Sequence, residues 1–190
     1  ASPSPQVLPP ATTDSMTDIE RPPSADRTVR LRVMVLLAGG VAALLTLVAA
    51  RFSRPGVGPD AVAYLAVANN LHGGGGIAFW LEDPLTTWPP LWPALIALGM
   101  ALSGAPADVA ALALNSLAVA GCVAAGFALG RRVLHSARLA YVALVSFAIS
   151  PLLIGLAVLV QTEVLFSLLA ALTMLAILRW SESQLRWWLV

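Results

Sequence analysis

Lysine is absent from this chain of 190 residues, and all eleven basic residues are arginine. Charged residues make up only 11% of the sequence, whereas about a quarter of an average soluble domain is charged. The net charge of +1 excludes a strongly basic nucleic-acid-binding protein. Because 58% of the residues are hydrophobic, these shortages predict an integral membrane protein. The preference for arginine and alanine also indicates a GC-rich bacterial genome.

Cysteine and the common catalytic motifs are equally scarce. The single cysteine, Cys122, lies inside an apolar run, which excludes a disulfide framework and a cysteine metal site and predicts a small buried residue. No Walker loop, dinucleotide-binding glycine motif, nucleophile elbow or zinc-ligand spacing occurs. The sequence therefore argues against an activity driven by nucleotide binding.

Five apolar runs are present, at 33–50, 91–103, 109–130, 139–160 and 164–180. A transmembrane helix needs about 20 apolar residues, and runs of about 10–14 residues are more often interfacial or re-entrant. The second run is the short one, and it has Pro89, Pro90 and Pro93 at its start. Its length predicts that it does not cross the membrane.

The arginines support the same interpretation. If the N-terminus is cytoplasmic and the second run stays at the outer face, only Arg51 and Arg54 lie outside. The arginines that would then lie inside include Arg27, Arg30, Arg32, Arg131, Arg132, Arg138, Arg179 and Arg186. The positive-inside rule strongly favours this arrangement over a crossing by the second run.

The expected fold is an all-α, polytopic bundle of transmembrane helices in the inner or plasma membrane. Its four spans are predicted at about 33–50, 109–130, 139–160 and 164–180, with an extracytoplasmic loop at 52–108 that carries surface helices at about 60–72 and 91–103. Residues 1–29 are rich in Pro, Ser and Thr and predict a disordered cytoplasmic tail, which leaves 30–190 as the membrane part. Pro151, with Ser146 and Ser150 before it, is expected to kink the third span.

The chain starts with Ala1 and ends on Arg186-Trp-Trp-Leu-Val190, which resembles the start of another span. We therefore expect an N-terminal piece of a longer protein that is inactive alone.

Two acidic residues flank the spans on the predicted outer side. Asp60 follows Pro59 and shares a helix face with Tyr64. Asp60 is either the N-cap of a helix that ends at the glycines at 73–76, or a carboxylate that takes a proton or holds a metal. Glu163 lies between two apolar runs, where it is either a functional acid or a side chain that reaches headgroup water.

The remaining polar and aromatic residues of the first loop allow weaker interpretations. His72 beside four glycines is more typical of a solvated loop residue than of a metal ligand, because no second histidine is near. Trp80, Trp88 and Trp92 are most simply interfacial anchors, although they could stack on a sugar ring or a lipid headgroup. Gly126-Phe-Ala-Leu-Gly130 fits small-residue helix packing.

Taken together, these motifs resemble a known family. The Asp60-x-x-x-Tyr64 helix, then Asn70-Leu-x-x-Gly-x-Gly76, then Trp88-Pro-Pro-Leu-Trp-Pro93 before a short helix, is similar to polyprenyl-phosphate-sugar-dependent membrane glycosyltransferases of the GT-C fold. Relatives include protein O-mannosyltransferases, aminoarabinose transferases and lipopolysaccharide-core transferases. The segment Thr162-Glu163-Val-Leu-Phe166 resembles their second acidic loop.

This resemblance implies an inverting transferase that moves a sugar from a polyprenyl-phosphate donor to a lipid, glycan or protein acceptor outside the cytoplasm. Asp60 would be the base or a metal ligand, and Glu163 would steer the acceptor or a divalent Mg, Mn or Zn ion. Substrate contacts would come from Tyr64, Asn69, His72, Trp88 and Trp92.

The chain departs from its relatives at two positions. Trp88 stands where several relatives have a lysine that faces the donor phosphate, so an arginine elsewhere would have to hold that phosphate. Ala61 stands where many relatives have a second acid.

Two other classes remain open from the sequence, namely a transporter or flippase of lipid-linked sugars and a non-catalytic membrane scaffold. A transporter predicts charged residues inside the spans and internal repeats, and the sequence shows neither.

Overall fold

The computed structural model describes residues 25–53, 58–78, 89–134 and 136–188. Every regular element within them is an α-helix, which confirms the all-α prediction. The helices are α1 (Ala25–Phe52), α2 (Pro59–His72), α3 (Leu91–Ser103), α4 (Ala107–Val133), α5 (Ala137–Ala148), α6 (Pro151–Val158) and α7 (Glu163–Trp188). Residues 1–24 of the predicted tail, Arg54, and the first-loop residues Trp80 and Trp88 lie outside the described residues, and α1 begins inside the predicted tail.

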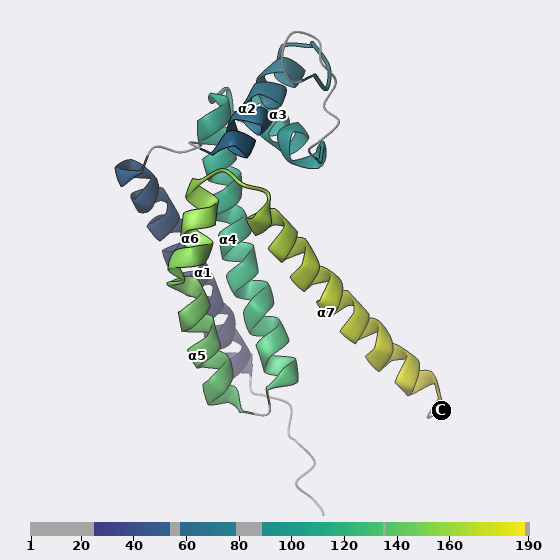
Figure 1. Ribbon diagram of the computed structural model, residues 1–190. Coiled ribbons are helices and arrows are strands. Elements are labelled where there is room, and N and C mark those ends of the chain that lie inside the picture. Colours follow the sequence, from purple (N-terminus) through teal and green to yellow (C-terminus); the bar gives the residue numbers. More distant parts are fainter. Residues whose placement is uncertain (1–24, 54–57, 79–88, 135, 189–190) are drawn as a thin grey trace, which may run out of the picture.

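Within the described residues, four segments are long and apolar enough to cross a membrane, as the sequence predicted. They are Val29–Phe52, Ala107–Val133, Ala137–Val158 and Glu163–Gln184. The 13 residues of α3 are too few, because a crossing needs about 20. Figure 1 shows α2 and α3 together beyond one end of the bundle formed by the longer helices.

Helix α4 is the centre of the bundle and contacts all the other helices. Its apolar residues Val119, Val123 and Phe127 join the main core cluster, and the Phe127 ring lies 5.6 Å from that of Tyr141 on α5. Cys122 is buried there as predicted, with 3% of its surface exposed. The first turns of α4 pack against α2 and α3, so one helix connects the bundle to the outer pair.

Small residues bring the helices close together. A Cβ added at Gly39 of α1 would lie 3.3 Å from the Ala120 carbonyl oxygen of α4, and one at Gly126 would touch Phe147 of α5. Helix association in membranes depends on such close packing because lipid supplies no hydrophobic drive between helices. The glycines of the Gly126–Gly130 motif thus take part in packing, as predicted.

The third span is interrupted where Pro151 predicted a kink. Helix α5 ends at Ala148, and Ser150 begins α6 as its N-cap, with the hydroxyl oxygen accepting a hydrogen bond from the Leu153 N–H at 3.4 Å. Proline lacks an N–H and its ring excludes the preceding turn, so the helix restarts at Pro151 rather than continuing.

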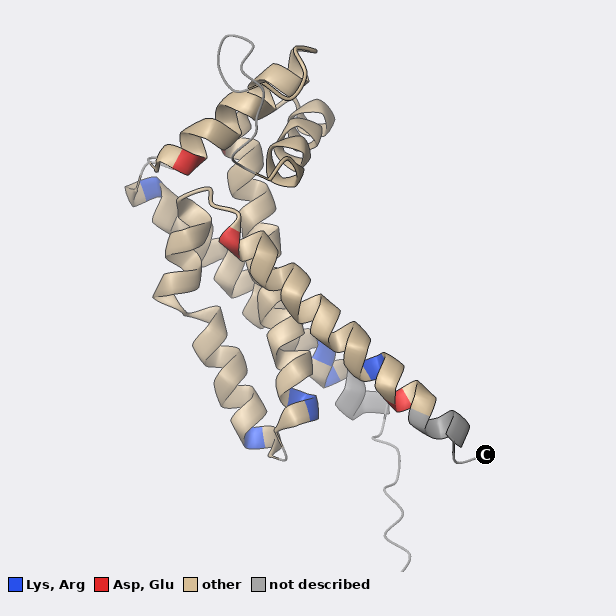
Figure 2. Cartoon of the chain, turned by 45° about the vertical axis from the view of Figure 1, so that its right-hand side comes forward, with Lys and Arg blue, Asp and Glu red and all other residues tan. Residues whose placement is uncertain are grey.

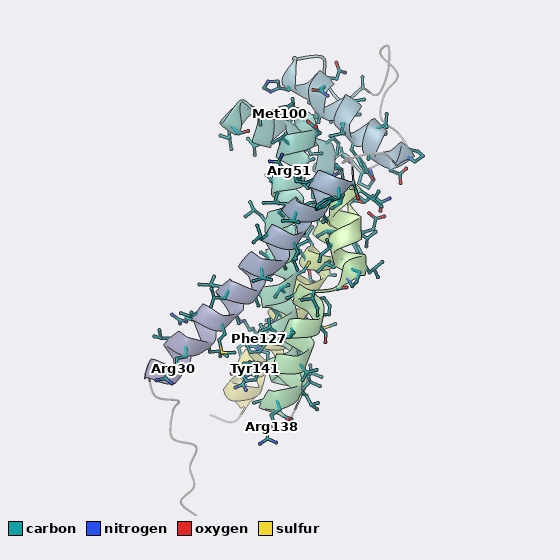
Figure 3. The ribbon with its side chains drawn as sticks, turned by 90° about the vertical axis from the view of Figure 1, so that its left-hand side faces the viewer. Arg30, Arg51, Met100, Phe127, Arg138 and Tyr141 are labelled. Carbon is teal, nitrogen blue, oxygen red and sulfur yellow. The ribbon has the colours of Figure 1, made fainter. Side chains whose placement is uncertain are left out.

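The charged residues divide between the two ends of the bundle (Figure 2). Arg30 and Arg138 lie at the end opposite α2 and α3, while Arg51 lies at the same end of the molecule as Met100 of α3 (Figure 3). At the first end Arg132 of α4 also pairs with Glu182 of α7 at 3.5 Å. Chain direction places the start of α2 and the start of α7 at the other end, so Asp60 and Glu163 lie at the same end of the molecule.

The close approach of α1 and α4 can be tested by a pair of adjacent glycines. Gly39→Leu is expected to lower the melting temperature in detergent, because the new side chain meets the α4 backbone and overpacking costs about 1–3 kcal/mol. Gly40→Leu should leave it nearly unchanged, since nothing lies within 4 Å of a Cβ there. Equal losses for the two variants would contradict the packing.

Candidate active site

Asp60 lies in the first turn of α2, the helix that starts the outer pair. Gly58 is the N-cap, in an extended conformation with φ −76° and ψ 152°, and Pro59 supplies the fixed φ that suits a first helical residue. Asp60 is therefore the second helical residue, and the alternative interpretation of Asp60 as the N-cap was wrong. A carboxylate in this turn is stabilised by the positive end of the helix dipole.

Tyr64 follows one helical turn later on the same face as Asp60, as the spacing predicted. Its side chain is 3% exposed and packs in a cluster with Trp92 of α3 and with Val160, which lies in the turn between α6 and α7. Tyr64 thus connects α2 with the segment that leads to Glu163.

Thr162 and Glu163 begin α7 at the other side of this cluster. The Thr162 carbonyl accepts the first helical hydrogen bond from the Phe166 N–H at 2.8 Å, which fixes the start of the helix. Thr162 is half-buried, whereas Glu163 is exposed.

The charges of both carboxylates affect the pKa of the Tyr64 phenol. Burial raises the pKa of Tyr64 above its ordinary value, a hydrogen bond with the Thr162 side chain acts in the opposite direction, and the negative charges of Asp60 and Glu163 raise the pKa further. The phenol therefore stays protonated at neutral pH and keeps an O–H to donate. Asp60 and Glu163 are about a hundred residues apart in sequence. Both nevertheless lie close enough to Tyr64 for their charges to affect its pKa.

An apolar groove opens beside Glu163. It has a volume of about 240 Å³ and lies between the start of α3 and the first turns of α7. Its lining is formed by Pro89, Leu91, Trp92, Thr162, Glu163, Leu165, Phe166 and Leu169. The groove can take a hydrocarbon chain, with the carboxylate and the threonine at its polar edge.

Trp92 is a packing residue rather than an interfacial anchor. Only 1% of its surface is exposed, and its indole Nε1–H donates to the Val160 carbonyl at 3.3 Å. An interfacial anchor would be open to the headgroup region, so that interpretation was wrong for Trp92. Its edge still lines the groove.

The polar residues at the far end of α2 lie away from the acids. At about 1.5 Å per residue, Asn69 is about 14 Å along the helix from Asp60 and His72 is about 18 Å along it. The Asn69 Nδ2 donates to its own helix at the Leu65 carbonyl, 2.8 Å, and His72 is exposed in the last turn. This structure does not bring these two of the five predicted substrate contacts to the carboxylates, and another of the five, Trp88, lies outside the described residues.

The glycine tract after α2 is shaped by Asn70. Its Nδ2 lies within hydrogen-bonding distance of the Gly75, Gly76 and Ala78 carbonyls, at 3.3–3.4 Å. A Cβ at Gly75 would collide with the Asn70 amide, and Gly76 has φ +79°. The tract ends the helix, as predicted, and the hydrogen bonds of Asn70 hold it against the last turn of α2.

Sequence reasoning missed two residues near the acids. Thr162 was visible only as a hydroxyl beside Glu163, and Asn115 only as a lone amide in the apolar run 109–130. Asn115 is fully buried on α4 and donates to the Ala157 carbonyl of α6 at 2.9 Å. The sequence did offer a signal for Asn115, because an amide inside a transmembrane span is costly unless it is hydrogen-bonded.

Fold and site together define a class, namely a polytopic α-helical membrane protein with two carboxylates and an apolar groove at one end. The family model described as dolichyl-phosphate-mannose-protein mannosyltransferase matches residues 87–190, more than half of the chain. The chain belongs to this family, and so is a membrane glycosyltransferase of the GT-C superfamily that uses a lipid-phosphate-linked sugar donor. No curated protein and no solved structure gives a significant match. The matched region contains Glu163 and the groove, but it begins after Asp60 and Tyr64.

The convergence of the two acids on Tyr64 can be measured without any assay of activity. In a Tyr141→Phe background, which leaves Tyr64 as the only tyrosine, absorbance at 295 nm should give a phenol pKa above the ordinary value. Asp60→Asn and Glu163→Gln should each lower that pKa, because a nearby negative charge disfavours tyrosinate. Asp108→Asn, at the start of α4, should not change it. An unchanged pKa in Glu163→Gln would contradict the arrangement.

Proposed function

We propose that the chain forms part of the site of an enzyme that transfers a sugar from a polyprenyl-phosphate donor to a hydroxyl of a lipid, glycan or protein on the extracytoplasmic side of the inner or plasma membrane, with Asp60 as the base. The single observation that carries this proposal is the position of Asp60 and Glu163, which lie in the first turns of α2 and α7 at the same end of the bundle, beside the cluster that contains Tyr64 and Val160. The charges of both acids also raise the pKa of Tyr64. Carboxylates on opposite sides of a membrane could not share one buried phenol.

The orientation follows from the arginines. Arg30, Arg32, Arg131, Arg132, Arg138 and Arg179 belong to helix ends remote from α2 and α3, and Arg51 is the described arginine at the acidic end. The positive-inside rule then favours a cytoplasmic location for the arginine-rich end and an extracytoplasmic location for the carboxylates. Donor and acceptor would meet at the outer face.

The proposed reaction is a direct displacement at the anomeric carbon. The acceptor hydroxyl gives its proton to Asp60 while its oxygen forms the new bond to that carbon. The bond from the carbon to the phosphate oxygen breaks, and the lipid phosphate leaves with the electron pair, so the configuration inverts. A carboxylate within hydrogen-bonding reach of the acceptor supplies the base, and the protonated Tyr64 can donate a hydrogen bond within the site.

The groove beside Glu163 suits the hydrocarbon part of the donor. Its walls on α7 are Leu165, Phe166 and Leu169, side chains that carry no hydrogen-bonding groups. A polyprenyl chain lying against these residues would place its phosphate near the polar edge formed by Thr162 and Glu163. The sugar would then lie between this edge and α2.

A divalent metal is the alternative role that we propose for Asp60, which would then hold the ion together with Glu163 instead of acting as the base. No cluster of three or more His, Cys, Asp or Glu is present in the described ranges, and Ala61, where many relatives have an acid, is fully buried. Two carboxylates suit Mg²⁺ or Mn²⁺, which take further ligands from water and phosphate, better than Zn²⁺. When bound, the ion would neutralise charge on the leaving phosphate.

The metal proposal predicts that EDTA abolishes turnover and that Mg²⁺ or Mn²⁺ restores it. The measurement is release of polyprenyl phosphate from a polyprenyl-phosphate-mannose donor in native membranes containing the protein. Turnover that survives EDTA would show that the carboxylates act without a metal.

The role of Asp60 is tested by Asp60→Asn in the same assay. Loss of a positioned base is expected to slow turnover by about 10²–10⁴-fold, while the melting temperature in detergent should fall only slightly, because the favourable interaction of the carboxylate with the helix dipole is small. Asp108→Asn removes an exposed acid at the same end of the molecule and should leave turnover intact. Full turnover in Asp60→Asn would rule out Asp60 as the base. Flipping of the donor without sugar transfer would instead indicate a transporter.

A further inference from the structure

The turn between α6 and α7 is held by side chains of other helices. Asn115 Nδ2 of α4 donates to the Ala157 carbonyl at 2.9 Å, and Trp92 Nε1 of α3 donates to the Val160 carbonyl at 3.3 Å. One turn further on, Cys122 Sγ lies 3.5 Å from the Val164 carbonyl. These bonds anchor the backbone on both sides of Thr162 and Glu163.

The anchored backbone is strained. Val160 has φ +57°, in the left-handed region that a β-branched residue rarely adopts. Such a conformation costs on the order of 1–3 kcal/mol and persists only where the surroundings hold it. The buried Val160 side chain packs in the cluster with Tyr64, which helps to explain why the turn keeps this shape.

Asn115 is a poor choice for stability alone. The residue is fully buried, and its Oδ1 has no hydrogen-bond partner among the described residues. A buried acceptor left unpaired costs about 1–3 kcal/mol, which an apolar residue at this position would avoid. The amide therefore contributes through its Nδ2, which holds the Ala157 carbonyl in place.

We propose that Asn115 is a positioning residue for the carboxylate site. By fixing the Ala157 carbonyl it sets the α6–α7 turn, and through the turn it sets Thr162 and Glu163 against Tyr64. This inference rests on the proposed function, because it assigns Asn115 a part in turnover although Asn115 does not itself touch the substrate.

The test compares Asn115→Leu with Ser116→Ala in the full protein. Ser116 is the next residue on α4 and is also buried, but its hydroxyl donates to its own helix at the Leu112 carbonyl, 2.8 Å. Hydrogen exchange should become faster in the turn at 157–163 of Asn115→Leu and stay unchanged in Ser116→Ala. Turnover of polyprenyl-phosphate mannose should show kcat reduced about tenfold or more in Asn115→Leu, with KM for the donor unchanged, because small misplacements of reacting groups are costly.

Asn115→Ser provides a second variant if Asn115→Leu does not fold. A serine hydroxyl can bond to its own helix, as Ser116 does, and because serine is smaller than asparagine it removes the bond to α6 without overpacking the span. Unchanged exchange in the turn, or unchanged kcat with only a lower melting temperature, would overturn the positioning role. If the wild-type protein shows no transfer, the proposed function fails, and the exchange comparison still decides whether Asn115 holds the turn.

Discussion

The length of α3 is the constraint on which the rest of the structure depends. Its 13 residues span about 20 Å at 1.5 Å per residue, whereas the hydrocarbon core of a bilayer is about 30 Å thick. Because α3 cannot cross, α4 starts at the same end of the bundle at which α1 finishes. The direction of each later helix follows from the position of α4, and the acids at the starts of α2 and α7 therefore lie at the same end.

Packing between the outer helices and the α6–α7 turn then brings the segments at this end of the bundle together. Trp92 of α3 and Tyr64 of α2 are buried against Val160, so the outer helices and the α6–α7 turn form one cluster. The strained backbone of Val160 and the unpaired Asn115 oxygen are local costs within a bundle otherwise packed through small and apolar residues. Such costs are typical of functional sites, where geometry is held at the expense of stability.

Much of the fold could be predicted from local signals. The apolar runs predicted the four spans, Pro151 the break between α5 and α6, and the short run after Pro89 the surface helix α3. These features depend on length, hydrophobicity and proline chemistry, which a single sequence displays. The motifs around Asp60 and Glu163 also indicated the glycosyltransferase family that the match over 87–190 shows.

The details of the site could not be predicted, because they depend on contacts between distant segments. The sequence placed Tyr64 beside Asp60 but gave no sign that Thr162 bonds to it or that Trp92 is buried under Val160. The N-cap role of Asp60 was wrong because Gly58, one residue before the proline, takes that position. Asn115 could have been noted as a lone amide in an apolar run, but its partner, the Ala157 carbonyl, could not be predicted because it belongs to another helix.

The central claim, that both acids face the outer side of the membrane, is tested most directly by cysteine labelling in a Cys122→Ser background. Single cysteines at Ser103, at the end of α3, and at Gln161, in the α6–α7 turn, should react in intact cells with a membrane-impermeant maleimide. Val133→Cys, at the opposite end of α4, should react only after permeabilisation. If Ser103→Cys or Gln161→Cys also required permeabilisation, α3 would cross or the bundle would be inverted, and the shared outer site would be contradicted.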